Sequence, residues 1–222
     1  MKYEVEIKSL LQTKENAQKL RDRLTEQGIQ LSNKYSQINH YFLNDSDFAK
    51  LEEKLLPLFD LEKKENLKKI LEKGKNHSIR TREMNGEVFL VMKASVDDTT
   101  SSNGILRMEF EERVGVSIDK LDKILEKSGF GYQAKWSRDR EEYKKDDFYI
   151  TIDRNAGYGY LSEFEIQTEK QDELSDAKQR ILSFMGDLGL EELSQERLER
   201  MFKFYNENWR DYYGTENVFN VE

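Results

Sequence analysis

Alternation between charged and apolar residues is the feature that most constrains what this chain can fold into. Near the N-terminus, KYEVEIK places Glu4, Glu6 and Lys8 at every second position, with tyrosine, valine and isoleucine at the others. Successive side chains of a β-strand point to opposite faces of the sheet. The stretch therefore predicts a strand with one charged and one apolar face, and the apolar face has to be buried against another layer.

The charges that share a strand face often have the same sign. Side chains at i and i+2 of a strand lie about 6.7 Å apart, and like charges close together destabilise a sheet. Paired carboxylates suit a hard divalent cation, and paired arginines suit phosphate oxygens. The pattern therefore favours a bound ligand, while an ordinary amphipathic sheet with one solvated face is the alternative. The five pairs are Glu4/Glu6, Arg80/Arg82, Glu109/Glu111, Arg138/Arg140 and Glu163/Glu165.

Strand-like and helical stretches alternate along the chain, and the pair Asn85-Gly86 between two alternating runs signals a hairpin. Mostly hairpin-like connections predict an α+β fold, an eight-stranded antiparallel β-barrel with helices packed outside. We expect a polar loop at 95–104. We expect strands at 2–10, 35–43, 78–84, 87–94, 105–114, 132–144, 147–154 and 160–168, and helices at 13–27, 45–73 (interrupted near Pro57), 117–128, 173–186 and 195–213.

Composition narrows the class of protein. Charged residues make up 36% of the 222, yet 11% are aromatic, which argues against a disordered chain. One proline and no Gly- or Pro-rich linker predict a single domain over 1–222, with the helices at 172–213 packed on the barrel. The absence of cysteine excludes disulfides and thiolate metal sites, and the net charge of −8 argues against coating nucleic acid. No apolar run could span a bilayer or serve as a signal peptide, so we expect a cytoplasmic protein with no membrane partner.

Strand alternation assigns fourteen charged side chains to the face opposite the apolar one. Burying so many ions for stability alone is unfavourable, because desolvation can cancel their mutual attraction. We therefore predict a charged barrel lumen that serves a function. The basic members are Lys8, Arg80, Arg82, Lys93, Arg107, Arg138 and Arg140, and the acidic members are Glu4, Glu6, Glu109, Glu111, Asp153, Glu163 and Glu165.

In their order along the chain, these stretches resemble the CYTH superfamily, also called triphosphate tunnel metalloenzymes, over about residues 1–170. Taken together in this order, the seven matching segments are specific to that superfamily. The matching segments are Glu4-Val5-Glu6-Ile7-Lys8, Asn39-His40-Tyr41-Phe42, Ile79-Arg80-Thr81-Arg82, Leu90-Val91-Met92-Lys93, Arg107 to Glu111, Arg138 to Tyr143, and Asp153 through Gly159 to Glu163-Phe164-Glu165.

The resemblance implies an eight-stranded tunnel that holds a triphosphate with Mg²⁺ or Mn²⁺. It implies that Lys93 and Tyr41 take part in catalysis, with Tyr41 orienting or deprotonating a water; a half-buried barrel aromatic is the alternative for Tyr41. The implied metal ligands are Glu4, Glu6, Asp153, Glu163 and Glu165. The implied triphosphate-binding residues are Lys8, Arg80, Arg82, Lys93, Arg107, Arg138 and Arg140, supported by Glu109 and Glu111.

Three functions fit this resemblance. The leading hypothesis is a metal-dependent hydrolase of inorganic triphosphate or of a nucleoside or organic triphosphate. The alternatives are a class IV adenylate cyclase and a non-catalytic polyphosphate-binding module.

The stretch 45–76 is longer than the family's usual connection and predicts either a solvated outer helix or a lid. The aromatic stripe of the last helix predicts packing on the barrel, with a homodimer contact as the alternative.

Overall fold

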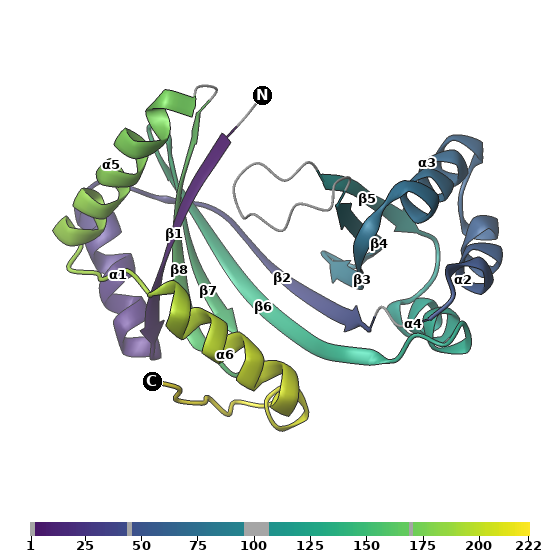
Figure 1. The fold of residues 1–222 in the computed structure, drawn as a ribbon. Helices are drawn as coiled ribbons and strands as arrows, with labels where there is room; N and C mark the ends of the chain where they lie inside the picture. Colours follow the sequence, from purple (N-terminus) through teal and green to yellow (C-terminus); the bar gives the residue numbers. More distant parts are fainter. Residues whose placement is uncertain (1–2, 44–45, 96–106, 169–170) are drawn as a thin grey trace. The chain divides into compact units, whose positions relative to one another are not determined.

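The structure is a computed structural model that describes residues 3–43, 46–95, 107–168 and 171–222 (Figure 1). The chain divides into two compact units, a first unit of residues 1–36 and 137–222 and a second unit of residues 37–136. The single domain expected over 1–222 stays a prediction.

The strands are β1 (Tyr3–Gln12), β2 (Leu31–Phe42), β3 (Lys75–Met84), β4 (Glu87–Ser95), β5 (Arg107–Val114), β6 (Tyr132–Lys145), β7 (Phe148–Asn155) and β8 (Gly159–Thr168). The helices are α1 (Lys14–Glu26), α2 (Phe48–Leu55), α3 (Leu61–Lys73), α4 (Ile118–Lys127), α5 (Leu174–Asp187) and α6 (Gln195–Asn208), with 3₁₀ turns η1 (Leu56–Leu58), η2 (Gln171–Glu173) and η3 (Trp209–Asp211).

The eight strands follow the order β1-β8-β7-β6-β2-β3-β4-β5 in one sheet. The pairs β1–β8, β8–β7, β7–β6, β2–β3, β3–β4 and β4–β5 are all antiparallel. The predicted α+β fold with eight antiparallel strands is confirmed. Nearly all of the polar loop expected at 95–104 lies outside the described residues.

One strand begins earlier than the sequence pattern indicated. β2 starts at Leu31, whereas the alternating pattern predicted a start at Tyr35. The polar first residues of β2 have partners on β6: the hydroxyl of Ser32 donates to the main-chain oxygen of Glu142 at 2.8 Å. Hydrogen-bond partners on another strand therefore hold this segment extended. The segment itself has no apolar alternation from which a strand could have been predicted.

In the first unit, α1 and α5 lie along β1 and β8 and cover their apolar face (Figure 1). Thr13 caps α1 by accepting from the backbone N–H of Asn16 at 3.2 Å. On β1 and β8 the buried apolar residues alternate with Glu6, Lys8, Glu163 and Glu165, so these charges lie on the opposite face. The strands contribute Ile7, Leu11, Tyr143, Ile150, Ile152, Phe164 and Ile166 to this core, and the helices contribute Ala17, Leu20, Leu24, Ala177, Ile181, Phe184 and Met185.

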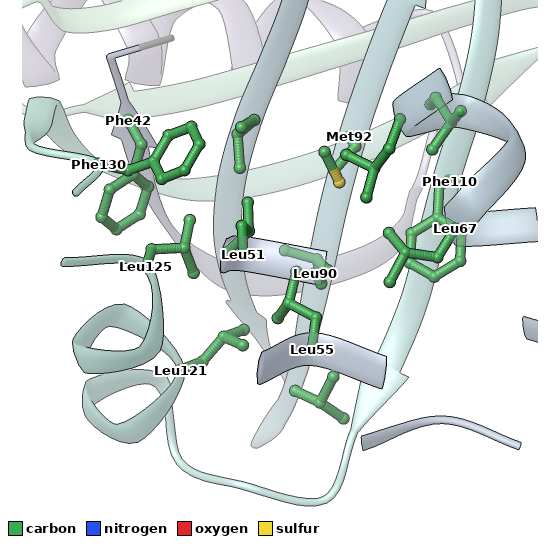
Figure 2. Close-up of a cluster of buried hydrophobic side chains, with 14 of the residues drawn as sticks. Phe42, Leu51, Leu55, Leu67, Leu90, Met92, Phe110, Leu121, Leu125 and Phe130 are labelled. Atoms are coloured by element: carbon green, nitrogen blue, oxygen red, sulfur yellow. The ribbon is translucent and has the colours of Figure 1, made fainter. Parts of the chain in front are cut away.

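In the second unit, α2, α3 and α4 supply the apolar layer. Figure 2 shows Leu51 and Leu55 of α2 and Leu121 and Leu125 of α4 on the same side of the sheet as Leu90 of β4, and all five are fully buried. The helix–sheet contacts here run from α3 to β4 and β5 and from α4 to β3. The apolar face that the sequence predicted is therefore covered by helices in this unit as well.

The described part of the stretch 45–76 is built into that core. It forms α2, η1 and α3, and η1 carries Pro57, where the predicted interruption falls. Leu67 and Ile70 of α3 are fully buried or nearly so, while the charged residues of α3 are mostly exposed. α3 is thus an amphipathic outer helix that covers β4 and β5.

The Asn85-Gly86 hairpin joins β3 to β4 as the sequence predicted. Met84 pairs with Glu87 across the turn, and Asn85 and Gly86 have φ values of 53° and 75°. A two-residue hairpin of this type needs both central residues in the left-handed region. The hairpin fixes the relative register of the strands that carry Arg80, Arg82 and Lys93.

The C-terminal aromatic residues pack within the first unit. Tyr205 and Trp209 are buried, and the ring of Tyr158 lies 5.5 Å from Tyr205 and 4.8 Å from Phe219 between centroids. Phe202 stays 55% exposed. Tyr205 and Trp209 of the stripe are therefore buried, while the packing of the last helix on the barrel and the homodimer contact stay predictions. Within the described ranges, no helix combines the length and apolar character needed to cross a bilayer.

A carboxylate on the helix-facing side of β6 ties α1 to the sheet. Arg21 of α1 donates from Nε to Oε2 of Glu141 at 2.7 Å, and Lys34 Nζ and the hydroxyl of Tyr143 donate to the same carboxylate at 3.1 and 3.0 Å. Burial raises the pKa of Glu141, but these donors outweigh it, and the pKa lies below its usual value.

We expect Glu141→Gln to lower the free energy of unfolding at neutral pH by about 2 kcal/mol, because hydrogen bonds to charged groups contribute about 1.5–3 kcal/mol. A depressed folded-state pKa stabilises above the unfolded-state pKa, and this contribution is lost as pH falls through the folded-state pKa. The difference between wild type and variant should therefore shrink below a pH of about 4. Urea unfolding at neutral and acidic pH measures it, and a pH-independent difference contradicts the assignment.

Candidate active site

Four strands of the first unit bring charged side chains to the face opposite the helices. Lys8 stands opposite Glu163 and Glu6 opposite Glu165 in the β1–β8 register. Arg140 stands opposite Asp153 in the β6–β7 register. Residues distant in the sequence thus form one group, the first-unit cluster, which comprises Glu6, Lys8, Arg138, Arg140, Asp153, Glu163 and Glu165.

Arg140 is the centre of the ion pairs in this cluster. It donates from Nε to Oδ1 of Asp153 at 2.8 Å and from Nη2 to Oδ2 at 2.5 Å, and Nη2 also donates to Glu163. Lys8 Nζ lies 3.0 Å from Oε1 of Glu163 and also donates to Glu6. Lys8 and Arg140 therefore neutralise much of the negative charge of Glu6, Asp153 and Glu163.

The cluster is strongly desolvated around Asp153, whose side chain is 2% exposed. Burial raises the pKa of Asp153 above its usual value although Arg140 is hydrogen-bonded to it and Arg138 Nη1 lies 3.6 Å away. Burial also acts to raise the pKa of Glu163, but Arg140 and Lys8 outweigh it and lower that pKa. Charges held out of water in this way interact more strongly with a charged ligand than they would in bulk solvent.

The acidic members of the cluster suit a hard divalent cation. Glu6 and Glu165 face each other across β1 and β8, and carboxylate oxygens are preferred ligands of Mg²⁺. Among the side chains that the structure describes, no three His, Cys, Asp or Glu residues converge as a metal site. Mg²⁺ is commonly held by one or two carboxylates and completed by substrate phosphates and water. The donor set therefore fits Mg²⁺ or Mn²⁺ that binds together with a phosphate.

In the second unit, β2 to β5 carry a further charged face, the second-unit cluster. It comprises Asn39, Tyr41, Arg80, Arg82, Lys93, Glu109 and Glu111, and its registers place Tyr41 opposite Arg80, Asn39 opposite Arg82 and Lys93 opposite Glu109. Lys93 Nζ lies 3.0 Å from Oε1 of Glu109. Arg80, Arg82 and Lys93 are thus gathered on one face, with both predicted supporting carboxylates, Glu109 and Glu111, on the same face.

Arg82 is held from two sides. Its Nε donates to Oδ1 of Asn39 at 3.1 Å, and its Nη1 donates to Glu111. Burial and the nearby charge of Arg80 lower the pKa of Arg82, and Glu111 opposes them. An arginine keeps its charge under such a shift, so two cations are kept close together on β3.

Arg80 lacks a carboxylate partner among the described residues. Its Nη1 donates to the hydroxyl of Tyr41 at 2.8 Å, and its guanidinium carbon lies 5.5 Å from the centroid of the Tyr41 ring. A guanidinium has five N–H donors, so most of those on this half-buried side chain are left for an anion.

Asn39 is a site residue that the sequence reasoning did not single out. It is fully buried, and its Oδ1 accepts from Arg82 and, at 3.2 Å, from Nε2 of Gln37. Its Nδ2 has no hydrogen-bond partner in the described part of the chain. A buried donor without an acceptor is costly, and a ligand oxygen would satisfy it. Strand alternation could have found Asn39, because it lies two residues before Tyr41 on the same face.

Two predicted site residues are placed only through their backbones. Glu4 stands opposite Gln167 on β8, and Arg107 stands opposite Ser95 on β4. The side chains of Glu4 and Arg107 lie outside the described parts of the structure. Their roles as metal ligand and triphosphate-binding residue stay predictions.

Known proteins resemble this chain in sequence pattern and in fold. The CYTH domain pattern matches residues 61–198, and no curated protein matches the chain. Two Pyrococcus horikoshii proteins, PH1012 and PH1819, have similar structures, with TM-scores of 0.55 and 0.54 at 17% and 24% identity. The matches cover 85% and 87% of this chain and 92% and 94% of those chains. A Vibrio parahaemolyticus protein described as a candidate adenylate cyclase has a TM-score of 0.51 at 16% identity, covering 90% of this chain and 98% of its own.

Proposed function

This chain belongs to the CYTH domain family, and on that basis we propose that it is a divalent-metal-dependent hydrolase of inorganic triphosphate or of a nucleoside or other organic triphosphate. The family contains triphosphatases and adenylate cyclases and generally depends on divalent metals. The observation that carries the proposal is the pair of unused donor groups in the second-unit cluster, on Arg80 and on Asn39 Nδ2. A phosphate group offers oxygen acceptors for the remaining N–H donors of Arg80 and for Asn39 Nδ2.

The basic residues of both clusters are assigned to the phosphates. Phosphoryl transfer depends on positioning and on neutralising charge more than on covalent chemistry, and arginines bind phosphate oxygens through two parallel N–H donors. The carboxylates beside them hold these cations in place. The assigned residues are Lys8, Arg80, Arg82, Lys93, Arg138 and Arg140, with Arg107 as a further member, and Glu109 and Glu111 hold Lys93 and Arg82.

The carboxylates of the first-unit cluster are assigned to the metal. Glu6 and Glu165 stand opposite each other in the β1–β8 register, so they are the first proposed pair of metal ligands. Glu4, Asp153 and Glu163 are the further proposed ligands. When bound, the ion neutralises charge on the phosphate oxygens and makes a water molecule more acidic. Asp153 and Glu163 also orient Arg140, and Glu163 orients Lys8.

Lys93 and Tyr41 are the proposed catalytic residues of the second unit. We expect Tyr41→Phe to lower kcat/KM by about 10-fold or more, because the variant keeps the ring but removes the oxygen that accepts from Arg80. Its free energy of unfolding should stay within about 1 kcal/mol of wild type. Steady-state kinetics with tripolyphosphate measure the effect, with Tyr212→Phe as a control outside both clusters. Wild-type kcat/KM for Tyr41→Phe would leave Tyr41 as a structural aromatic.

Product analysis with ATP tests the reaction class. The chain is incubated with ATP and Mg²⁺ or Mn²⁺, and the products are separated by anion-exchange chromatography. The proposal expects hydrolysis that releases phosphate or pyrophosphate without cyclisation. Cyclic AMP with pyrophosphate would contradict it and support an adenylate cyclase. Tight ATP binding without any product under either metal would contradict it and support a binding module.

A further inference from the structure

A buried carboxylate lies on the helix-facing side of the second unit, behind the strands of the second-unit cluster. Asp122 belongs to α4, and its side chain is 2% exposed. Its Oδ1 accepts from the hydroxyl of Thr81 at 2.6 Å. Its Oδ2 lies 2.6 Å from Nδ1 of His40 and accepts from the hydroxyl of Tyr132 at 2.7 Å. Three residues from β2, β3 and β6 thus meet one carboxylate on a helix.

The surroundings make this carboxylate costly to bury. Its neighbours in the sequence and on the next turn, Leu121 and Leu125, are fully buried and point into the apolar cluster of Figure 2. Burial raises the pKa of Asp122, but the hydrogen bonds from His40, Thr81 and Tyr132 outweigh it and lower the pKa. Asp122 is therefore ionised at neutral pH and only accepts, so Nδ1 of His40 carries a proton.

The two strand residues that Asp122 holds are a cross-strand pair. His40 and Thr81 stand directly opposite each other in the β2–β3 register. Their chain neighbours Asn39, Tyr41, Arg80 and Arg82 point to the other face, where Tyr41 contacts Arg80 and Asn39 contacts Arg82. A slip of one residue between two strands moves every side chain of one strand to the wrong face. Fixing His40 against Thr81 therefore fixes these four residues, of which Asn39 and Arg80 carry the unused donors.

We propose that Asp122 is a positioning residue for the reaction, which holds β2 and β3 from behind so that Arg80, Arg82 and Asn39 present their donors to the phosphates. This inference rests on the proposed function. A structural role alone explains the buried Asp122 poorly, because well-packed apolar residues often stabilise a core as much as a buried ionic group does. What apolar residues cannot supply is one acceptor that joins both strands to α4.

Isosteric changes at Thr81 and Asp122 test the proposal. Thr81→Val removes the hydroxyl and keeps the shape, and Asp122→Asn removes the charge and keeps the size. Thr81→Ser keeps the hydroxyl, and Leu125→Ala loosens the packing of α4 without touching the network. The first two variants should lower kcat/KM for tripolyphosphate by about 10–100-fold, mainly through KM, at temperatures where thermal unfolding shows them folded. Thr81→Ser and Leu125→Ala should keep wild-type values under the same condition.

A second measurement separates this proposal from the proposed function. The side-chain Nε–H of Arg82, which donates to Asn39, can be followed by NMR hydrogen exchange without any turnover. It should exchange faster in Thr81→Val and Asp122→Asn than in wild type and Thr81→Ser. Unchanged exchange and unchanged kcat/KM in folded variants would overturn the positioning role. A wild type that neither binds nor hydrolyses triphosphates would overturn the proposed function, and the exchange data would still decide whether Asp122 positions Arg82.

Discussion

Arg140→Ala is expected to lower the turnover of tripolyphosphate by about 10³-fold and the free energy of unfolding by about 3–5 kcal/mol. Arg140 hydrogen-bonds to two carboxylates, Asp153 and Glu163. Without it, Asp153 keeps only Arg138 at 3.6 Å as a cationic partner among the described residues, although its side chain is 2% exposed. A buried charge left without its partner is strongly destabilising. Steady-state kinetics and urea unfolding of the same preparation measure both effects.

Arg180→Ala is the matched control for this prediction. Arg180 forms the same two-pronged contact with Asp147, at 2.8 and 2.7 Å, but the two side chains are 43% and 44% exposed. Exposed ion pairs contribute about 1 kcal/mol or less, and neither residue belongs to a charged cluster. The control should therefore keep wild-type turnover and nearly wild-type stability. Equal losses in the two variants would contradict the role assigned to the first-unit cluster.

Glu6→Ala is expected to lower turnover by about 10²-fold or more at a fixed, low metal concentration and to move the metal dependence to higher concentrations. Glu6 faces Glu165 across the β1–β8 register and is the more exposed of the two. Removing one of two facing like charges offsets the lost contact with Lys8, so stability should change by less than about 1 kcal/mol. Phosphate release across Mg²⁺ and Mn²⁺ titrations measures the effect.

Mn²⁺ binding followed by electron paramagnetic resonance gives a readout for Glu6→Ala that does not depend on turnover. Glu112→Gln is the control, because Glu112 also lies on a strand but pairs with Lys63 of α3 at 3.0 Å on the helix-facing side. The control should bind Mn²⁺ as the wild type does, whereas Glu6→Ala should bind it more weakly. If Glu6→Ala keeps wild-type Mn²⁺ affinity and turnover, the metal assignment fails.

The face on which each charged residue lies was predictable from the sequence. Side-chain direction in a strand depends on odd or even position alone, so Glu163 and Glu165 could be placed opposite Phe164 and Ile166 without knowing any neighbour. The same rule puts His40 on the other face from Tyr41. Strand existence and the hairpin at Asn85-Gly86 follow from equally local signals, which explains why the α+β fold with eight antiparallel strands was predictable.

The register between β6 and β7 was not predictable, and it changes how the like-charged pair Arg138/Arg140 is interpreted. The pair Arg138/Arg140 suggested a bound anion, but in the structure Asp153 on the neighbouring strand neutralises much of that charge. Apart from the hairpin at Asn85-Gly86, the sequence pattern does not say at what offset neighbouring strands pair. The evidence for a ligand therefore moves to Arg80, which has no carboxylate partner among the described residues, and to Asn39 Nδ2.

The hydrogen-bond network around Asp122 could not be predicted from the sequence either. His40 and Asp122 are 82 positions apart in the chain, and Asp122 sits within a helix whose apolar pattern predicts only packing. Contacts between a helix and the back of a sheet depend on tertiary packing, which no periodicity of either segment records.

The central claim, a metal-dependent triphosphatase, is tested most directly by phosphate release from tripolyphosphate by the purified chain with Mg²⁺, with Mn²⁺ and with a chelator. Arg80→Ala in the same assay reports whether the second-unit cluster acts on that substrate. The account predicts release that requires the metal, stops with the chelator and falls by about 10²-fold or more in Arg80→Ala. No release with either metal, or release that persists in the chelator and in Arg80→Ala, would contradict it.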